Sequence, residues 1–78
     1  MSYALSALLG PARARILLDA HEPRTTSQVA RDCALALSTA SHHLTVLRDA
    51  GLVASTRDGA RMLHRRTPLG EAMVGAVL

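Results

Sequence analysis

The chain of 78 residues is 49% hydrophobic and 19% charged, and its formal net charge is +3. That length allows a single domain, and the hydrophobic share is too high for a disordered segment of this charge. No apolar run approaches the ~20 residues that span a bilayer, residues 1–4 do not read as a signal peptide, and the one cysteine fits a reducing compartment.

The opening apolar run of residues 4–9 ends at Gly10, and a first helix is expected over residues 11–20. Pro11 suits the first position of that helix, because its fixed φ angle is already helical. The helix is expected to end before Pro23, since the residue that precedes a proline avoids the helical region.

A second helix is expected to begin at a capping box and to run to about Cys33. Thr25 and Gln28 stand three residues apart, so each side chain can bond the backbone N–H of the other. The turn that follows, residues 34–36, is short enough to place the next helix across this one.

A third helix is expected over residues 37–50. Its apolar stripe has the spacing that one face of a helix requires, and consists of Ala40, Leu44 and Leu47. Gly51 suits the left-handed residue that ends many helices. Ala36 has no side chain that could cap the helix, so a later start with Ser38 as the cap is an alternative.

After this glycine the period of the apolar pattern changes from about 3.6 to about 2 residues, which predicts a β-hairpin. Two strands are expected over residues 52–56 and 61–66, and the Asp-Gly pair at residues 58–59 favours the tight turn between them. The Thr-Pro pair at residues 67–68 has the order of a cap and a first helical residue, so a last helix should follow.

Helix, helix, short turn, helix, hairpin and helix predict a winged helix-turn-helix domain, mainly α with a β-hairpin wing, over residues 1–78. The last helix ends without a cap at Leu78, which favours either a truncated chain or a module of a longer regulator. Apolar residues at both ends exceed what the other elements must bury, and we expect a homodimer through the N- and C-terminal helices. These residues are Leu5, Leu8, Leu9, Leu69, Met73 and Val77.

Such a domain can place its third helix in the major groove of double-stranded DNA, which is ~12 Å wide and admits one helix. The exposed positions of that helix carry groups that can reach base edges and phosphates, namely Ser38, Thr39, Ser41, His42, Thr45 and Arg48. A solvent-facing helix usually prefers charged side chains, so groove contact is favoured over the alternative of an ordinary polar face.

Arginine side chains cluster on the predicted hairpin. All nine basic residues of the chain are Arg, which binds phosphates and guanine edges bidentately, although codon usage in a GC-rich genome is an alternative reason for their number. Arg57, Arg61, Arg65 and Arg66 face only Asp58 as an opposing charge. We expect the hairpin to lie along the phosphate backbone or in the minor groove. Protection of an edge strand against aggregation is the alternative.

Three segments together resemble the ArsR-type winged-helix regulators, namely residues 26–30, 41–53 and 57–61. The signature of that family is Ser-x-His-Leu-x-x-Leu-x-x-x-Gly-Leu-Val followed by a basic hairpin, and the likeness extends over about residues 11–70. The resemblance implies a homodimer that binds operator DNA near a palindrome and usually represses transcription. A cytoplasmic, nucleoid-associated location in bacteria and no membrane partner are expected accordingly.

Residue roles follow from the same resemblance. Ser41 and His42 would face bases, while Thr39, Thr45 and the hairpin arginines would hold the DNA backbone. His43 occupies the position of the family's own histidine and would pack partly under the hairpin.

The chain departs from the family pattern at three positions. Ala34 and Ala36 stand where the family commonly has Gly in the turn and Ser as the cap of the recognition helix. Loss of such a cap costs ~1 kcal/mol. His64 stands where the family often carries Tyr, which leaves the packing under the hairpin open.

No metal or other cofactor is expected. The positions that carry thiolates in metal-sensing relatives hold Thr25, Ser27 and Ala30 in this chain. Cys33 is alone on an apolar face, where a core residue is favoured over a ligand, because a metal site needs several converging ligands.

An enzyme is not expected either, since the chain shows no Gly-rich phosphate loop, no carboxylate pair and no nucleophile beside a base. The alternative function is a winged helix that associates with proteins without binding DNA. Such a module should expose large apolar side chains on the third helix, where Val46 is the one candidate.

Overall fold

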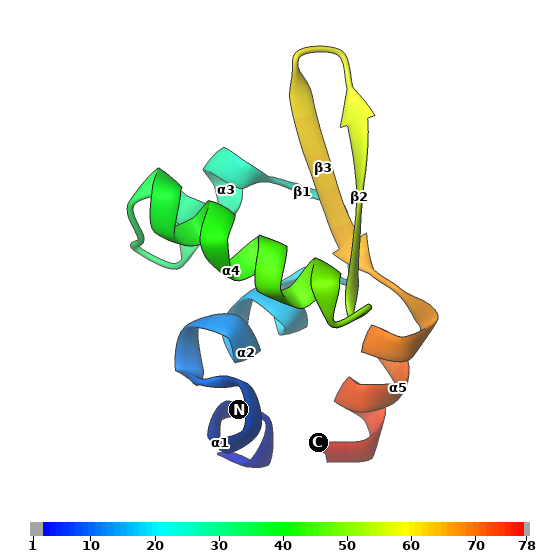
Figure 1. Cartoon of the computed structure of the whole chain (residues 1–78). Helices are drawn as coiled ribbons and strands as arrows, with labels where there is room; N and C mark the ends of the chain where they lie inside the picture. The colour runs from blue at the N-terminus through cyan, green and yellow to red at the C-terminus, as the bar shows by residue number, and fades with distance from the viewer. Residues whose placement is uncertain (1–2, 78) are drawn as a thin grey trace.

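The computed structural model describes residues 3–77, which form five helices and three strands (Figure 1). The helices are α1 (Tyr3–Leu9), α2 (Pro11–Asp19), α3 (Thr26–Asp32), α4 (Leu37–Asp49) and α5 (Pro68–Val77). The strands are β1 (Arg24–Thr25), β2 (Val53–Asp58) and β3 (Arg61–Arg66), and they form an antiparallel sheet in the order β1-β3-β2.

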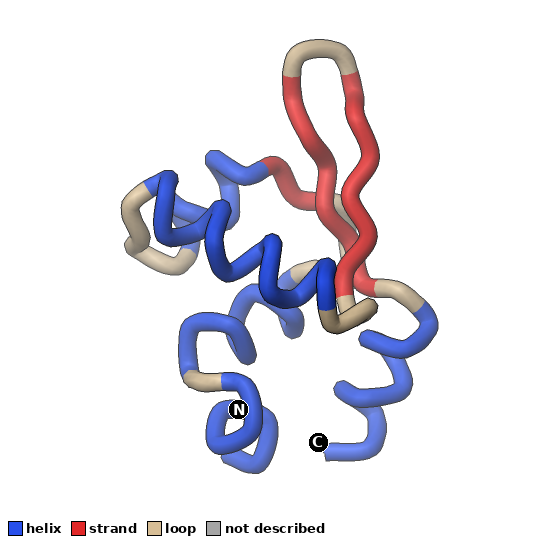
Figure 2. The backbone as a smooth tube through the Cα atoms, viewed as in Figure 1, coloured by secondary structure: helices blue, strands red, loops and turns tan. Residues whose placement is uncertain are grey.

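The β2–β3 hairpin projects from the helices as a wing. In Figure 1 it stands above the helical part, whereas α1 and α5 lie side by side at the opposite end. Figure 2 shows the same arrangement, with the loop at the tip of the wing far from both ends of the chain. Because α4 contacts α2, α3 and β2, it is held between the other helices and the base of the wing.

The core is aliphatic. Its largest fully buried side chains come from α1, α2, α4 and β2, and are Leu5, Ile16, Leu17, Leu44, Leu47 and Val53. Tyr3, the single aromatic residue of the chain, is 87% exposed and takes no part in the core. Burial of Leu44 and Leu47 together with Ala40 confirms the predicted apolar stripe of α4.

The sequence correctly predicts the starts of α2 and α3. Gly10 has a φ angle of 87°, and Pro11 is the first residue of α2. The Thr25 hydroxyl accepts a hydrogen bond from the Gln28 N–H at 3.1 Å, and the Gln28 side chain accepts one from the Thr25 N–H at 2.9 Å. The capping box is therefore formed as predicted.

Gly51 ends α4 as expected. Its φ angle is 77°, and its N–H bonds the Arg48 carbonyl at 2.9 Å. The Leu52 N–H bonds the Leu47 carbonyl, also at 2.9 Å. These two bonds form the Schellman motif, which turns the chain from α4 directly into β2.

The start of α4 lacks a side-chain cap. The helix begins at Leu37 with Ala36 as its N-cap residue, so the alternative start with Ser38 as the cap is wrong. In the preceding turn Ala34 has a φ angle of 54°, a left-handed conformation that costs a residue with a Cβ roughly 1–2 kcal/mol. The chain thus keeps the turn and the helix start without the Gly and Ser of the ArsR-type pattern.

Strand β1 was not predicted from the sequence. Residues 24–25 pair with β3, with Arg24 opposite His64 and Thr25 opposite Leu63. Two residues are too few to show an alternating pattern, so the sequence predicted only the end of one helix and the cap of the next at these positions. β2 also extends beyond its predicted end, which moves the turn by one position to residues 59–60.

The two terminal helices bury more of their apolar residues than expected. Of the six that should form a continuous exposed patch, four are buried or packed against the core, and these are Leu5, Leu9, Met73 and Val77. Leu8 and Leu69 are exposed, at 62% and 55%. The prediction of one continuous apolar patch is therefore wrong, and of these six residues only Leu8 and Leu69 are exposed.

The inward face of α5 is formed by residues one position after the apolar residues at 69 and 73. Gly70 and Val74 are buried, whereas Leu69 is exposed. The helix is capped as predicted, because the Thr67 hydroxyl accepts a bond from the Gly70 N–H at 3.0 Å. No helix within residues 3–77 has the length and apolar character needed to cross a membrane.

Candidate nucleic-acid interface

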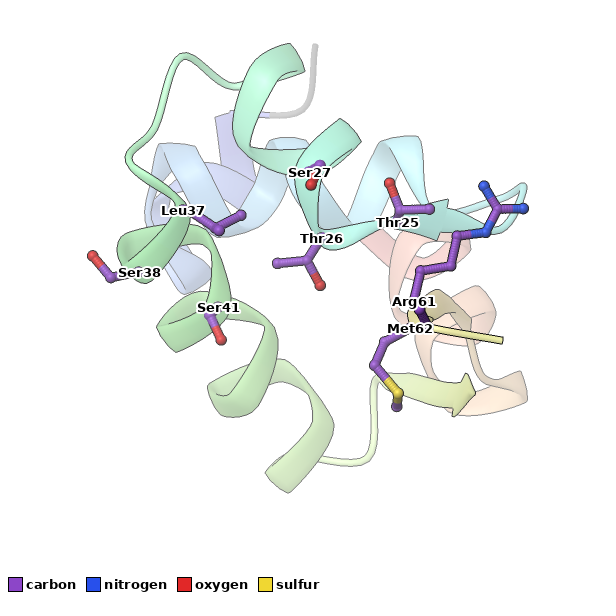
Figure 3. A pocket seen from close by; sticks show the side chains of 9 residues that line it. Thr25, Thr26, Ser27, Leu37, Ser38, Ser41, Arg61 and Met62 are labelled. Carbon is purple, nitrogen blue, oxygen red and sulfur yellow. The ribbon is translucent and has the colours of Figure 1, made fainter. Parts of the chain in front are cut away.

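An open groove of about 530 Å³ separates the first turns of α4 from the wing (Figure 3). Its lining comes from β1, from the N-terminal parts of α3 and α4 and from the tip of the wing, and consists of Thr25, Thr26, Ser27, Leu37, Ser38, Ser41, Ala60, Arg61 and Met62. In Figure 3, Ser41 of α4 and Met62 of β3 lie on opposite sides of this groove. Hydroxyl groups, an arginine and apolar side chains thus share one surface.

The predicted contact residues of α4 do not all face the groove. Ser38 and Ser41 line it, and His42 is exposed beside them. Thr39 is exposed but does not line the groove, because adjacent helical positions point about 100° apart. The Thr45 hydroxyl donates to the Ser41 carbonyl at 3.0 Å and is half-buried.

A chain of hydrogen bonds joins α4, the wing and α3. The Arg48 guanidinium donates to the Ser55 hydroxyl at 3.3 Å and to the Thr45 hydroxyl at 3.4 Å. The Ser55 hydroxyl lies 2.7 Å from Nδ1 of His64, and Nε2 of this ring lies 2.8 Å from the Thr26 hydroxyl. These hydrogen bonds therefore hold the wing against both helices of the helix-turn-helix.

His64 is at the centre of this series of hydrogen bonds and is only 3% exposed. Burial lowers the pKa of its ring below the ordinary 6.5, and the positive charge of Arg48 lowers it further. The neutral ring has one donor and one acceptor nitrogen, which matches a hydroxyl on either side. The position that departs from the tyrosine of the ArsR-type pattern is thus filled by a bridging histidine.

His43 does not pack under the wing, in contrast to the expectation. Burial lowers the pKa of its ring below 6.5, and the charges of Arg13 on α2 and of His42 lower this pKa further. Its ring centroid is 5.8 Å from that of His42, and its Nδ1 is buried without a hydrogen-bond partner among the described residues. His43 therefore belongs to the side of α4 that faces α2.

The register of the wing separates its arginines onto two faces. Arg57 is opposite Met62, on the same face as Ser55, which contacts α4. Arg61 and Arg65 lie on the other face, because successive residues of a strand point to opposite sides. All three arginines are exposed, so both faces of the wing carry positive charge.

Two hairpin arginines have acidic partners. Arg61 bonds Asp58 at 3.1 Å near the tip, where both side chains are exposed. Arg66 lies at the base of the wing, where its side chain is 11% exposed and bonds Glu71 of α5 at 3.0 Å. The hairpin arginines were expected to cluster at the tip, which is wrong for Arg65 and Arg66, because both pair with the first residues of β2 at the base of the wing. Arg66 anchors the wing to α5.

Residues 3–77 contain no group of three or more side chains that could hold a metal ion. Cys33 is half-buried against the core. Burial raises the pKa of its thiol, and the charge of Arg15 offsets part of that rise. A thiol with a raised pKa is a poor metal ligand, because the thiolate is the form that binds.

Two apolar residues of the groove, Leu37 and Met62, were not predicted as site residues from the sequence. Leu37 is 57% exposed at the first residue of α4, whereas Val46, the one expected candidate for an exposed large apolar side chain, is half-buried. The predicted start of the helix at residue 37 was the signal that could have shown the exposure of Leu37. A first helical residue lies before the buried part of the helix, which begins here at Ala40.

Two crossed helices, a basic wing beside the second of them and a groove between helix and wing define a winged helix-turn-helix domain of the transcription-regulator class. The chain belongs to the helix-turn-helix domain family, whose model matches residues 8–56.

Solved structures with similar folds agree with this assignment. Rv0081 of Mycobacterium tuberculosis is 33% identical with a TM-score of 0.78, and the match covers 95% of this chain and 82% of that one. A possible transcriptional regulator for arsenical resistance is 31% identical with a TM-score of 0.78, over 94% and 75% of the two chains.

A homodimeric winged helix-turn-helix DNA-binding domain from Mycobacterium bovis, Mb0332, is 30% identical. It is described as a possible ArsR-family transcriptional regulator, its TM-score is 0.74, and the match covers 94% of this chain and 73% of that one. No curated protein matches the chain. The family and these regulators confirm the prediction of an ArsR-type regulator domain rather than an enzyme.

Proposed function

We propose that residues 1–78 act as a module that binds double-stranded DNA in a sequence-specific manner, with α4 in the major groove and the wing against the backbone or minor groove. The observation that carries this proposal is the groove between α4 and the wing, which combines serine hydroxyls with an arginine. Hydroxyls can bond either base edges or phosphates, whereas exposed arginines bind phosphates without regard to sequence.

In this arrangement α4 and the wing have different tasks. His42 and Ser41 are exposed on α4 and reach bases, while Ser38, Thr45 and Arg48 contact the backbone that borders the groove. The exposed arginines of the wing, Arg57, Arg61 and Arg65, supply the charge that attracts DNA. Thr39 is exposed on α4 outside the groove lining, and it is proposed as a further contact to the DNA backbone.

Two substitutions test this division. His42→Ala should reduce discrimination between a duplex selected from a random pool and an unrelated duplex by roughly 1–3 kcal/mol, because one base contact is lost. Arg57→Ala should weaken binding to both duplexes by a similar factor. Fluorescence anisotropy at fixed salt measures both effects, and Arg15→Ala on α2 is the control for loss of an exposed arginine outside the wing.

The reverse pattern, in which Arg57 controls the choice of sequence and His42 does not, contradicts these roles.

A second function, association with a protein, is favoured by the exposure of Leu37 on α4. Under that alternative, the affinity for duplex DNA would be weak and Arg57→Ala would leave it unchanged.

The module is further proposed to bind as a homodimer through α1 and α5, on the nucleoid of a bacterial cell. These helices contact each other and expose Tyr3, Leu8 and Leu69, and the similar Mycobacterium bovis domain is homodimeric. A two-fold axis would set two copies of α4 about one DNA turn apart, ~34 Å, or a multiple of it. A dimer bound to a promoter would block transcription, which supports a repressor role over activation.

A further inference from the structure

Leu37 is the most exposed large apolar side chain on α4. It is 57% exposed, is the first residue of the helix and lines the groove. In Figure 3 it projects toward the gap between α4 and α3, on the side of the groove that also holds Ser27. An apolar group of a bound ligand would cover this side chain and remove it from water, which is favourable.

The surroundings of Leu37 restrict what that partner can be. Ser41 is four residues further on, so its hydroxyl lies on the same face of α4 one turn away. Arg61 also lines the groove on the wing side, where its charge is paired with that of Asp58. A ligand that suits this surface presents a small apolar group close to a hydrogen-bond acceptor, and the exposed arginines of the wing favour an anionic one.

Thymine in duplex DNA meets this requirement. Among the four bases it alone presents a methyl group in the major groove, beside the O4 acceptor of the same ring. Leu37 can cover the methyl group while a hydroxyl such as that of Ser41 donates to O4. Met62, from the wing, offers a second flexible apolar surface on the opposite side of the groove.

We propose that Leu37 is a specificity-determining residue that contacts the 5-methyl group of a thymine in the major groove of the bound DNA. This inference rests on the proposed DNA binding and adds to it one base preference and the residue that sets it.

The test uses deoxyuridine, which differs from thymidine only by the missing methyl group. A duplex is selected from a random pool with the wild-type protein, and each thymine is replaced singly by deoxyuridine. At one position in each half-site, the replacement should weaken wild-type binding about fourfold, the effect of one methyl group removed from water. Leu37→Ala should bind the thymine and deoxyuridine duplexes equally.

Two controls make the result specific. Leu69→Ala removes a leucine of similar exposure on α5, far from the groove, and must keep the wild-type ratio of the two affinities even where the dimer weakens. Circular dichroism establishes that Leu37→Ala is folded, as expected for an exposed residue.

The inference is overturned if no deoxyuridine position affects wild-type binding, or if Leu37→Ala retains the full deoxyuridine penalty. Both outcomes leave the proposed DNA binding intact, because the wild-type protein still selects and binds a duplex. If the wild-type protein binds no duplex at any salt concentration, the proposed function fails and this inference fails with it.

Discussion

At the residue scale, His64 shows why the position under the wing tolerates a histidine. Its two ring nitrogens lie 2.7 Å from the Ser55 hydroxyl and 2.8 Å from the Thr26 hydroxyl. A buried polar atom without a partner costs roughly 1–3 kcal/mol, so both contacts are needed. The sequence places a polar ring at this position but does not name its partners, since Thr26 is 38 positions away.

The lowered pKa values of His64 and His43 predict that the domain loses stability in mild acid. Below pH 6.5 the unfolded chain takes up protons at these histidines before the folded domain does. The free energy of unfolding should therefore fall as the pH drops from 6.5 through the lower folded pKa values, and level off below them. Urea unfolding of the wild type, measured between neutral and acidic pH, follows this change.

His64→Gln and His43→Gln provide the comparison. Each variant should show a shallower dependence of unfolding free energy on pH than the wild type, whatever its stability at neutral pH. Wild-type dependence in both variants would mean that other groups control the stability in acid.

At the element scale, α5 illustrates how a helix face is chosen by close backbone contact. A Cβ built on Gly70 would overlap the carbonyl oxygen of Leu52, whereas a Cβ on Gly75 would meet nothing within 4 Å. The two glycines belong to the same helix, but only the first allows α5 to approach the segment between α4 and β2.

Gly70→Ala and Gly75→Ala should therefore have opposite effects. Gly70→Ala should destabilise the domain by roughly 1–3 kcal/mol, because the backbone of α5 must move away from Leu52. Gly75→Ala should stabilise it by roughly 0.5–1 kcal/mol, because alanine loses less conformational entropy in a helix. Thermal or urea unfolding measures the change in unfolding free energy of both variants. Equal changes in the two variants would contradict the close approach at Gly70.

Among the helices and strands, the features that the sequence predicts are those set by neighbouring residues. Local signals were sufficient for the Thr25 capping box, the Gly51 stop and the buried stripe of α4. Features set by packing were not, such as the short strand β1 and the inward face of α5, where Gly70 rather than Leu69 is buried. The bridge from Arg48 to the wing likewise depends on how separate elements meet.

The candidate site was predicted in the same uneven way. Ser38, Ser41 and Arg61 line the groove as their positions suggested, but Leu37 and Met62 were missed because apolar residues were assigned to the core. The ion pairs of the hairpin arginines could not be predicted, since they depend on strand register and on the position of Glu71.

At the scale of the whole molecule, the exposed leucines at the ends of the fold support self-association. Leu69→Glu should shift the purified domain toward the monomer at high micromolar concentration, because a charge would be placed in the proposed α1–α5 interface. Leu37→Glu, at a leucine of similar exposure in the groove, should leave the dimer unchanged. Sedimentation velocity measures both, and a wild-type monomer at that concentration would exclude this interface.

The salt dependence of binding to duplex DNA tests the central claim most directly. If the three exposed arginines of the wing each neutralise one phosphate, the slope of log affinity against log salt should be about −2.7 per domain. A fourfold rise in salt would then weaken binding about 40-fold, and Arg57→Ala should make the slope shallower by about 1. An affinity that changes by less than about twofold over the same range would contradict DNA binding through the wing.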